Sequence, residues 1–131
     1  MWPRKTAVNP EVILWPPKNQ SSSSLCWYTA PTGAYEAQRV VMNQPYIEFS
    51  NGYGAGRITG GKDRGGWGDD AFNDMENHGL CPTQYCPNNQ AGLDKKYRTD
   101  ANAKIASENR IADGWWKLEP NNIEQVASLL L

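Results

Sequence analysis

The sequence lacks the features that would direct it to a membrane, a secretory route or a nucleic acid. Its formal net charge is −1, so there is no electrostatic case for a nucleic acid or an anionic membrane surface as partner. No segment approaches the roughly 18 consecutive apolar residues of a membrane span. The first five residues, Met-Trp-Pro-Arg-Lys, lack the apolar run of a signal peptide. A cytoplasmic or virion location is therefore expected.

Cysteine and histidine are also scarce, with three cysteines and one histidine. An odd number of cysteines leaves at least one thiol unpaired within the chain. Cys81 and Cys86 are close enough in sequence to pair or to remain reduced, which leaves Cys26 as the single thiol. Together with His78 they lack the fourth ligand of a structural zinc site, so neither a metal nor a cofactor is expected.

The residues that are present suit one small, loop-rich domain. Hydrophobic residues make up 39% of the chain, and six Trp and six Tyr supply much of the area available for burial. Twelve Gly and nine Pro predict many turns. The expected organisation is a single α+β domain over residues 1–131, with three parts. These are an extended segment (1–20), a loop and helix (21–42), and long loops with two further helices and a short strand (43–131).

The first helix is predicted over residues 26–42. Its apolar face would be formed by residues spaced three and four apart, namely Trp27, Ala30, Ala34, Ala37 and Val41. Pro31 and Gly33 interrupt the pattern and predict a kink or a tight first turn. The four serines at residues 21–24 suit either a flexible linker or an N-terminal cap of this helix.

A second helix is predicted over residues 68–78. Asp69 and Asp70 suit its positive N-terminal end better than a metal or acid–base pair, because adjacent helical residues do not face each other. Its apolar face would be formed by Ala71, Phe72 and Met75. Gly79 would end it in a left-handed conformation.

A short strand is predicted over residues 114–118, and a third helix from Asn121 or Asn122 onward. That helix has no stop signal before the final Leu129-Leu130-Leu131, so a continuation of the polypeptide or another covering chain is expected. The stretches 43–66 and 79–102 are rich in Gly, Asn, Pro and charged residues and are predicted to be irregular.

The segment around Cys26 carries the chemistry. A cysteine at the start of a helix meets the partial positive charge of unsatisfied amides, which favours the nucleophilic thiolate. The backbone amide of Cys26 could face a developing oxyanion, and Gln20, six residues earlier, could add a side-chain donor.

Five motifs in order resemble the papain-like (C1) cysteine peptidases. Residues 16–20 and 23–27 read Pro-Pro-Lys-Asn-Gln and Ser-Ser-Leu-Cys-Trp, similar to the family's segment around the nucleophile. Gly-Ala-Tyr-Glu at 33–36 resembles a stretch of the family's central helix. Gly-Gly-Trp-Gly at 65–68 with Gly-Leu at 79–80, and Glu-Pro-Asn-Asn at 119–122, resemble its later segments.

This resemblance implies a mainly helical, nucleophile-bearing half of that fold, acting on a peptide or protein substrate. It assigns Cys26 as nucleophile and Gln20 as oxyanion-hole donor. It assigns substrate binding to four adjacent residues, Gly65, Gly66, Trp67 and Gly68. A disulfide usual in the family would join the positions of Ser23 and Asp63, and neither is a cysteine here. Leu25 and Pro31 also depart from the family's pattern.

The family's catalytic His and Asn lie roughly 130–150 residues after the Cys, which is beyond Leu131. His78 is expected to be a helix-end residue and not a base. The resemblance therefore implies a half-domain that is inert alone and is completed by a β-rich, His-bearing segment or second chain. The alternative is a non-catalytic structural subunit of a large assembly, such as a phage virion, that retains the half-fold.

Overall fold

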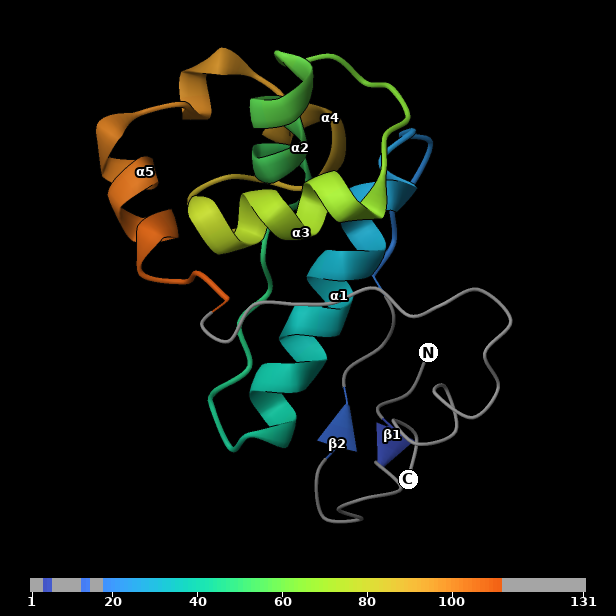
Figure 1. Cartoon of the computed structure of the whole chain (residues 1–131), viewed down its shortest axis with the longest axis vertical. Coiled ribbons are helices and arrows are strands. Elements are labelled where there is room, and N and C mark those ends of the chain that lie inside the picture. The colour runs from blue at the N-terminus through green and yellow to red at the C-terminus, as the bar shows by residue number, and fades with distance from the viewer. Residues whose placement is uncertain (1–3, 6–12, 15–17, 112–131) are drawn as a thin grey trace.

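A computed structural model describes residues 4–5, 13–14 and 18–111 of the chain, and this part is mainly helical (Figure 1). Two-residue strands β1 (Arg4–Lys5) and β2 (Ile13–Leu14) pair antiparallel, with Arg4 opposite Leu14. None of the described helices is both long and apolar enough to span a bilayer. The strand predicted over 114–118 and the helix predicted after Asn121 lie outside the described residues.

The first predicted helix is confirmed as α1 (Cys26–Val41), which continues through Pro31 without a break. Two threonines bond back to the preceding turn: Thr29 Oγ1 donates to the Leu25 carbonyl at 2.8 Å, and Thr32 Oγ1 to the Tyr28 carbonyl at 2.7 Å. Such bonds satisfy hydroxyls that would otherwise be buried without a partner.

The predicted apolar face of α1 is wrong. Ala30 and Ala34 are exposed and Val41 is 36% exposed, whereas Tyr28, Thr32 and Glu36 are buried. The buried row is mostly polar, and apolar periodicity cannot detect a polar face whose groups are all bonded inside the protein. Only Trp27 of the predicted stripe is buried.

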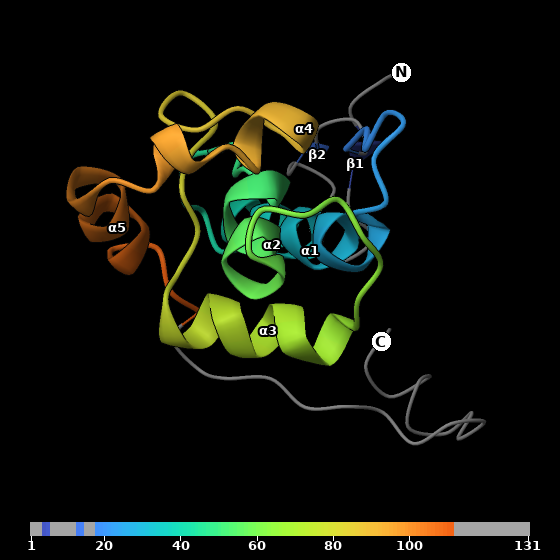
Figure 2. The ribbon, with the colours of Figure 1, turned by 90° about the horizontal axis from the view of Figure 1, so that it is seen from above.

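The stretch 43–66 is not irregular, because it contains α2 (Asn51–Thr59). Figure 2 shows α2 in the middle of the molecule, with α3 on one side and α4 on the other. The sequence pattern did not predict this helix because it contains three interior glycines, and glycine is a poor helix former. Tertiary packing requires them: a Cβ at Gly54 would overlap the Tyr28 hydroxyl, and one at Gly56 would overlap the Arg98 guanidinium.

The second predicted helix is confirmed as α3 (Gly68–Asn77). Ala71 and Met75 are buried, and Phe72 is half-buried, as the pattern predicts. His78 is the C-terminal cap residue, and Gly79 follows with a φ of 84°. A Cβ at Gly79 would overlap the Ala106 carbonyl, so glycine serves both the turn and the packing there.

The stretch 79–102 is not irregular either. It holds α4 (Asn89–Gly92), the 3₁₀ turn η1 (Lys95–Tyr97) and the start of α5 (Asp100–Ser107). The Arg98 guanidinium bonds three backbone carbonyls, those of Gly52, Tyr53 and Gly92, and lies over the Tyr53 ring at 4.5 Å. Burial lowers the pKa of Arg98. These contacts fasten the segment to α2, and no local sequence pattern predicts them.

A buried polar cluster joins α1, α2 and α3. Tyr28 donates its hydroxyl to Asp74 Oδ2 at 2.7 Å, and Arg57 donates to the same oxygen at 2.8 Å. Burial, and then the Asp74 carboxylate, raise the pKa of Tyr28 well above its ordinary value, so the phenol keeps its proton. Each member of this cluster has a partner, which is the condition for burying polar groups at low cost.

Candidate functional site

Cys26 is the first residue of α1, and its side chain is exposed. The residue before it, Leu25, is the N-cap and is completely buried in the main core. Leu25 therefore anchors the start of the helix by packing, without a side-chain cap hydrogen bond. This packing explains why Leu25 is apolar, although the papain-like family usually has a small polar residue at this position.

The four serines at residues 21–24 form neither a linker nor a cap. They build an ordered turn, in which the Ser23 hydroxyl and backbone N–H both bond to the Gln20 carbonyl, at 2.6 and 3.1 Å. The half-buried Gln20 in turn donates its Nε2 to the Ser23 carbonyl at 2.8 Å. A primary amide carries two N–H groups, so one N–H of Gln20 is not used by this bond.

Lys18 holds the segment that leads to Gln20. Its ammonium group donates to Glu36 Oε2 at 2.9 Å and to the Phe49 carbonyl at 2.8 Å. Burial raises the pKa of Glu36, while Lys18 and the Phe49 N–H act in the opposite direction. Removing one partner of a buried ion pair strongly destabilises the folded protein. The Lys18–Glu36 pair therefore fixes this segment against α1.

Trp27 brings the segment 64–68 to the start of α1. Its indole Nε1 donates to the Arg64 carbonyl at 2.9 Å. A Cβ at Gly66 would lie 2.7 Å from two atoms of the Trp27 ring, which is closer than real Cβ contacts. Glycine at this position thus allows the backbone to lie directly against the indole.

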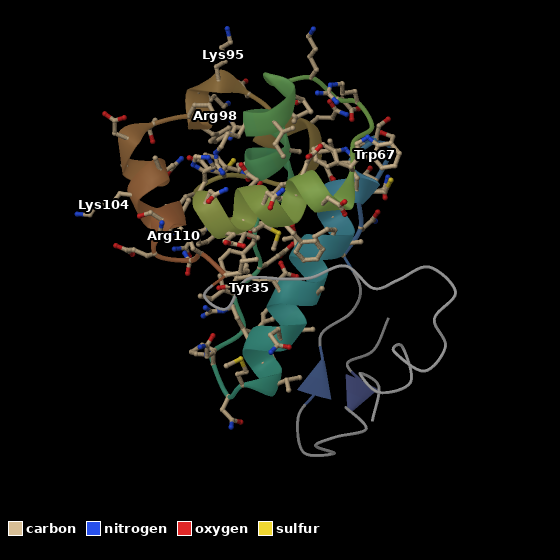
Figure 3. The ribbon with its side chains drawn as sticks, in the orientation of Figure 1. Tyr35, Trp67, Lys95, Arg98, Lys104 and Arg110 are labelled. Carbon is tan, nitrogen blue, oxygen red and sulfur yellow. The ribbon has the colours of Figure 1, made fainter. Side chains whose placement is uncertain are left out.

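The four residues predicted to bind substrate lie along this segment. Trp67 is 77% exposed, the largest exposure among the large hydrophobic residues that the structure describes. Figure 3 shows Trp67 beside the start of α1, where Cys26 begins the helix. A Cβ at Gly65 or Gly68 would meet open space. The structure therefore places Cys26, the Gln20 turn and this segment at one end of α1.

Hydrogen bonds connect the segments that carry Ser23 and Asp63, the two positions of the disulfide that is usual in the papain-like family. The Ser24 N–H donates to Asp63 Oδ1 at 2.7 Å, and Gln90 donates to Asp63 Oδ2 at 2.5 Å. Ser23 contributes separately, through a 3.4 Å bond from its hydroxyl to Asn89. No local sequence pattern points to Asn89, because Ser23 and Asn19, which it bonds, lie more than 60 residues away in the chain.

His78 lies far from this end of the molecule. It caps the C-terminal end of α3, whereas Gly68 begins that helix. Ten helical residues at about 1.5 Å each separate the two ends by roughly 15 Å. The expectation that His78 is a helix-end residue is confirmed, and it cannot serve as the base for Cys26 in this arrangement.

Cys81 and Cys86 are both free thiols, completely buried in a second core cluster with Tyr53 and Ala106. Burial raises the pKa of Cys81 to about 12 and also raises that of Cys86. They are therefore poor nucleophiles in the folded protein. Among the described residues no group of three or more His, Cys, Asp or Glu side chains is placed to hold a metal ion.

No protein-family model matches the sequence, and no curated protein matches it. Among solved structures, the crystal structure of xylellain, a cysteine protease from Xylella fastidiosa, is similar, with a TM-score of 0.63 at 20% sequence identity. The match covers 86% of this chain and 48% of xylellain, so the chain spans about half the length of that protease. The described residues are thus mainly helical and share their fold with about half of that protease.

Proposed function

We propose that this chain is the nucleophile-bearing half of a papain-like cysteine peptidase. A segment outside these 131 residues, in the same polypeptide or a second chain, supplies the His and Asn. The observation that carries the proposal is the exposed Cys26 at the start of α1, with the Gln20 turn and the Trp27-supported segment beside it. The substrate is a peptide or protein.

The reaction follows from these positions. Cys26 Sγ attacks the substrate carbonyl, and a thioester forms as the peptide C–N bond breaks. The completing histidine accepts the thiol proton and returns it to the leaving amine, and water then hydrolyses the thioester. The second N–H of the Gln20 amide and the Cys26 backbone amide stabilise the oxyanion. Gly66 and Trp67 hold the extended substrate.

The exposed face of α1 also supports a completing segment. Ala30 and Ala34 are exposed although both are apolar, and Val41 and Met42 are 36% and 55% exposed. A row of small apolar side chains permits another backbone to approach a helix closely. The proposed His-bearing half would cover this row and reach Cys26 at its end.

The test is to compare the 131-residue chain with the protein at its natural length, whose denatured mass shows whether the polypeptide continues. Iodoacetamide reacts with thiolates, so alkylation at mildly acidic pH reports activation of Cys26. We expect Cys26 in the natural-length protein, with any partner chain, to react about tenfold faster or more than in the isolated chain. Cys81 and Cys86 stay unmodified in both, because they are buried.

Peptide hydrolysis supplies the second measurement. We expect hydrolysis in the complete protein, its loss in Cys26→Ala and its retention in His78→Ala. The isolated chain should be inactive, because nothing described in it can return a proton to the leaving amine. Hydrolysis by the isolated chain that depends on Cys26 but not on His78 would contradict the proposal that the chain is only half of the active enzyme. A natural-length protein with ordinary thiol reactivity and no hydrolysis would favour the structural subunit.

A further inference from the structure

The turn that carries Gln20 and leads to Cys26 is bonded at two places by the side chain of Asn89, at the start of α4. Asn89 Nδ2 donates to the Asn19 carbonyl at 3.2 Å. Its Oδ1 is a second, longer acceptor for the Ser23 hydroxyl at 3.4 Å, beside the Gln20 carbonyl at 2.6 Å. The two contacts lie on either side of Gln20, so Asn89 spans the turn at both ends.

Asn89 is itself held rigidly by the core. Its backbone N–H donates to Asn51 Oδ1 at 2.7 Å, and its Oδ1 accepts from Asn51 Nδ2 at 2.9 Å. Asn51 is completely buried, and its Nδ2 also donates to Thr29 Oγ1 of α1 at 2.8 Å. A continuous chain of bonds therefore runs from the first turns of α1, through Asn51 and Asn89, back to the Gln20 turn.

The backbone at Asn89 is unusual and is made possible by close packing. Its φ is 60°, in the left-handed region that Asn occupies more readily than most residues. A Cβ at Gly52 would lie 2.6 Å from the Asn89 carbonyl oxygen. Glycine in α2 therefore leaves the space in which Asn89 adopts this conformation and turns its side chain to Asn19 and Ser23.

A second side chain also bonds this turn, at its last residue. The Ser24 N–H donates to Asp63 Oδ1, and the neighbour of Asn89, Gln90, holds Asp63 through its Oδ2. The start of α4 thus secures residues 19–24 directly through Asn89 and indirectly through Asp63.

We infer that Asn89 is a positioning residue, which sets the place of the Gln20 side chain relative to Cys26. The inference rests on the proposed function, since it concerns the oxyanion-binding donor of that reaction. Asn89 contacts neither substrate nor the thiol; it acts through the turn. Removing one oxyanion donor costs about 10²–10³ in rate, and a displacement of about 1 Å can cost about 10²-fold.

The variant that isolates the side chain is Asn89→Gly, because glycine accepts the left-handed φ without strain. The matched control is Asn88→Ala. Asn88 has the same chemistry, but its side chain bonds the Asn51 N–H and Glu48 Oε1 and does not contact the turn. Both variants lose a side-chain hydrogen bond to Asn51.

Hydrogen exchange in the natural-length protein is the first readout. We expect Asn89→Gly to speed exchange of the Ser23 and Ser24 amides about tenfold or more relative to Asn88→Ala. Exchange in α3 should be equal in the two variants. Equal exchange of the turn in both variants would overturn the inference. Hydrogen exchange can be measured without peptidase activity. It therefore tests whether Asn89 holds the turn even if the proposed function is wrong.

Kinetics supply the second readout. We expect Asn89→Gly to lower kcat/KM about tenfold or more, mostly through kcat, and Asn88→Ala to change it less than about twofold. Asn89→Asp keeps the acceptor for Asn51 and Ser23 but cannot donate to Asn19, so its loss should be intermediate. A fall confined to KM, or an equal fall in the Asn88→Ala control, would contradict the positioning role.

Discussion

The two sides of α1 show opposite uses of similar spacing. One row, Tyr28, Thr32 and Glu36, repeats every four residues and is buried. The other row, Cys26, Ala30 and Ala34, also repeats every four residues and is exposed. The buried row is the more polar of the two, which reverses the usual expectation for a helix on a hydrophobic core.

Hydrogen-bond partners, and not the polarity of the side chains, therefore determine which side of this helix is buried. Tyr28 bonds Asp74, Thr32 bonds the preceding turn, and Glu36 pairs with Lys18. With the polar groups of these three residues satisfied, this side can pack against α2 and α3. The alanine side has no such requirement and is left open at the end where Cys26 lies.

The largest effect is expected where α2 meets the buried side of α1. In Gly54→Ala the new Cβ would overlap the Tyr28 hydroxyl, which is completely buried and bonded to Asp74. The Tyr28 hydroxyl cannot move away from the new Cβ without breaking its bond to Asp74. We therefore expect a loss of about 3 kcal/mol in the free energy of unfolding. Urea denaturation measures it.

The matched control is a second glycine-to-alanine change inside a helix, Gly33→Ala in α1. A Cβ there would meet only the Lys18 side chain, at an ordinary 3.6 Å. Alanine is the better helix former, so a gain of roughly 0.5–1 kcal/mol is expected. Equal effects of the two changes would show that the close approach of α1 and α2 is not a constraint.

A smaller loss is expected when the Tyr28 hydroxyl is removed. Tyr28→Phe leaves Asp74, a buried carboxylate, with Arg57 as its remaining partner in this cluster. Hydrogen bonds to charged groups contribute about 1.5–3 kcal/mol, and the low end is expected because Arg57 remains. Tyr35→Phe is the control, since its ring packs on Phe49 and lies outside the cluster; it should cost under about 0.5 kcal/mol.

The contrast between open and buried positions extends to the thiols. The pKa of Cys81 is raised to about 12, so the folded protein keeps this proton at pH values where the unfolded chain has lost it. The unfolded state then binds fewer protons, and the free energy of unfolding falls as pH rises from about 8.5 toward 12. The slope from this group reaches at most about 1.4 kcal/mol per pH unit.

Urea denaturation between neutral pH and about pH 10 measures this slope. Cys81→Ala should make the alkaline decline shallower, though Cys86 and Tyr28, whose pKa values are also raised, keep part of it. Leu93→Ala, a cavity variant without a titrating group, should shift the whole curve and leave its slope unchanged. An unchanged slope in Cys81→Ala would contradict the assignment.

The smallest effect on stability is expected on the open side of α1. Ala34 is exposed, so Ala34→Arg should change the free energy of unfolding of the 131-residue chain by less than about 0.5 kcal/mol. In the natural-length protein the same change should abolish peptide hydrolysis, because the proposed His-bearing half lies there. Asn73→Arg, at an exposed position of α3, is the control for added charge. Equal activity of the two variants would refute coverage of this side.

Local patterns in the sequence predicted only part of the fold. They placed the starts of α1 and α3 correctly, since both depend on neighbouring residues. They missed α2 because its glycines are selected by contacts with Tyr28, Arg98 and α4, which are distant in sequence. They missed α5 although Thr99 caps it, because the surrounding stretch is dominated by turn-forming and charged residues.

The candidate site divides in the same way. Cys26, Gln20 and the segment 65–68 could be named from the order of motifs, because each motif is local. The groups that hold them could not be named: Asn89 reaches Asn19 across 70 residues, and Asp63 reaches Ser24 across 39. The half-buried Lys18 belongs to both classes, since it lies in a recognised motif but its partner Glu36 is revealed only by packing.

The order of residues alone indicated a cysteine at the start of one helix and the one histidine at the end of another. These follow from residue identity and short spacing, which tertiary contacts do not alter. Three features depend on packing instead: which side of α1 is buried, why α2 needs its glycines, and which side chains hold the Gln20 turn. Those choices depend on atoms brought together from distant parts of the chain, where burial and hydrogen-bond satisfaction outweigh local propensity.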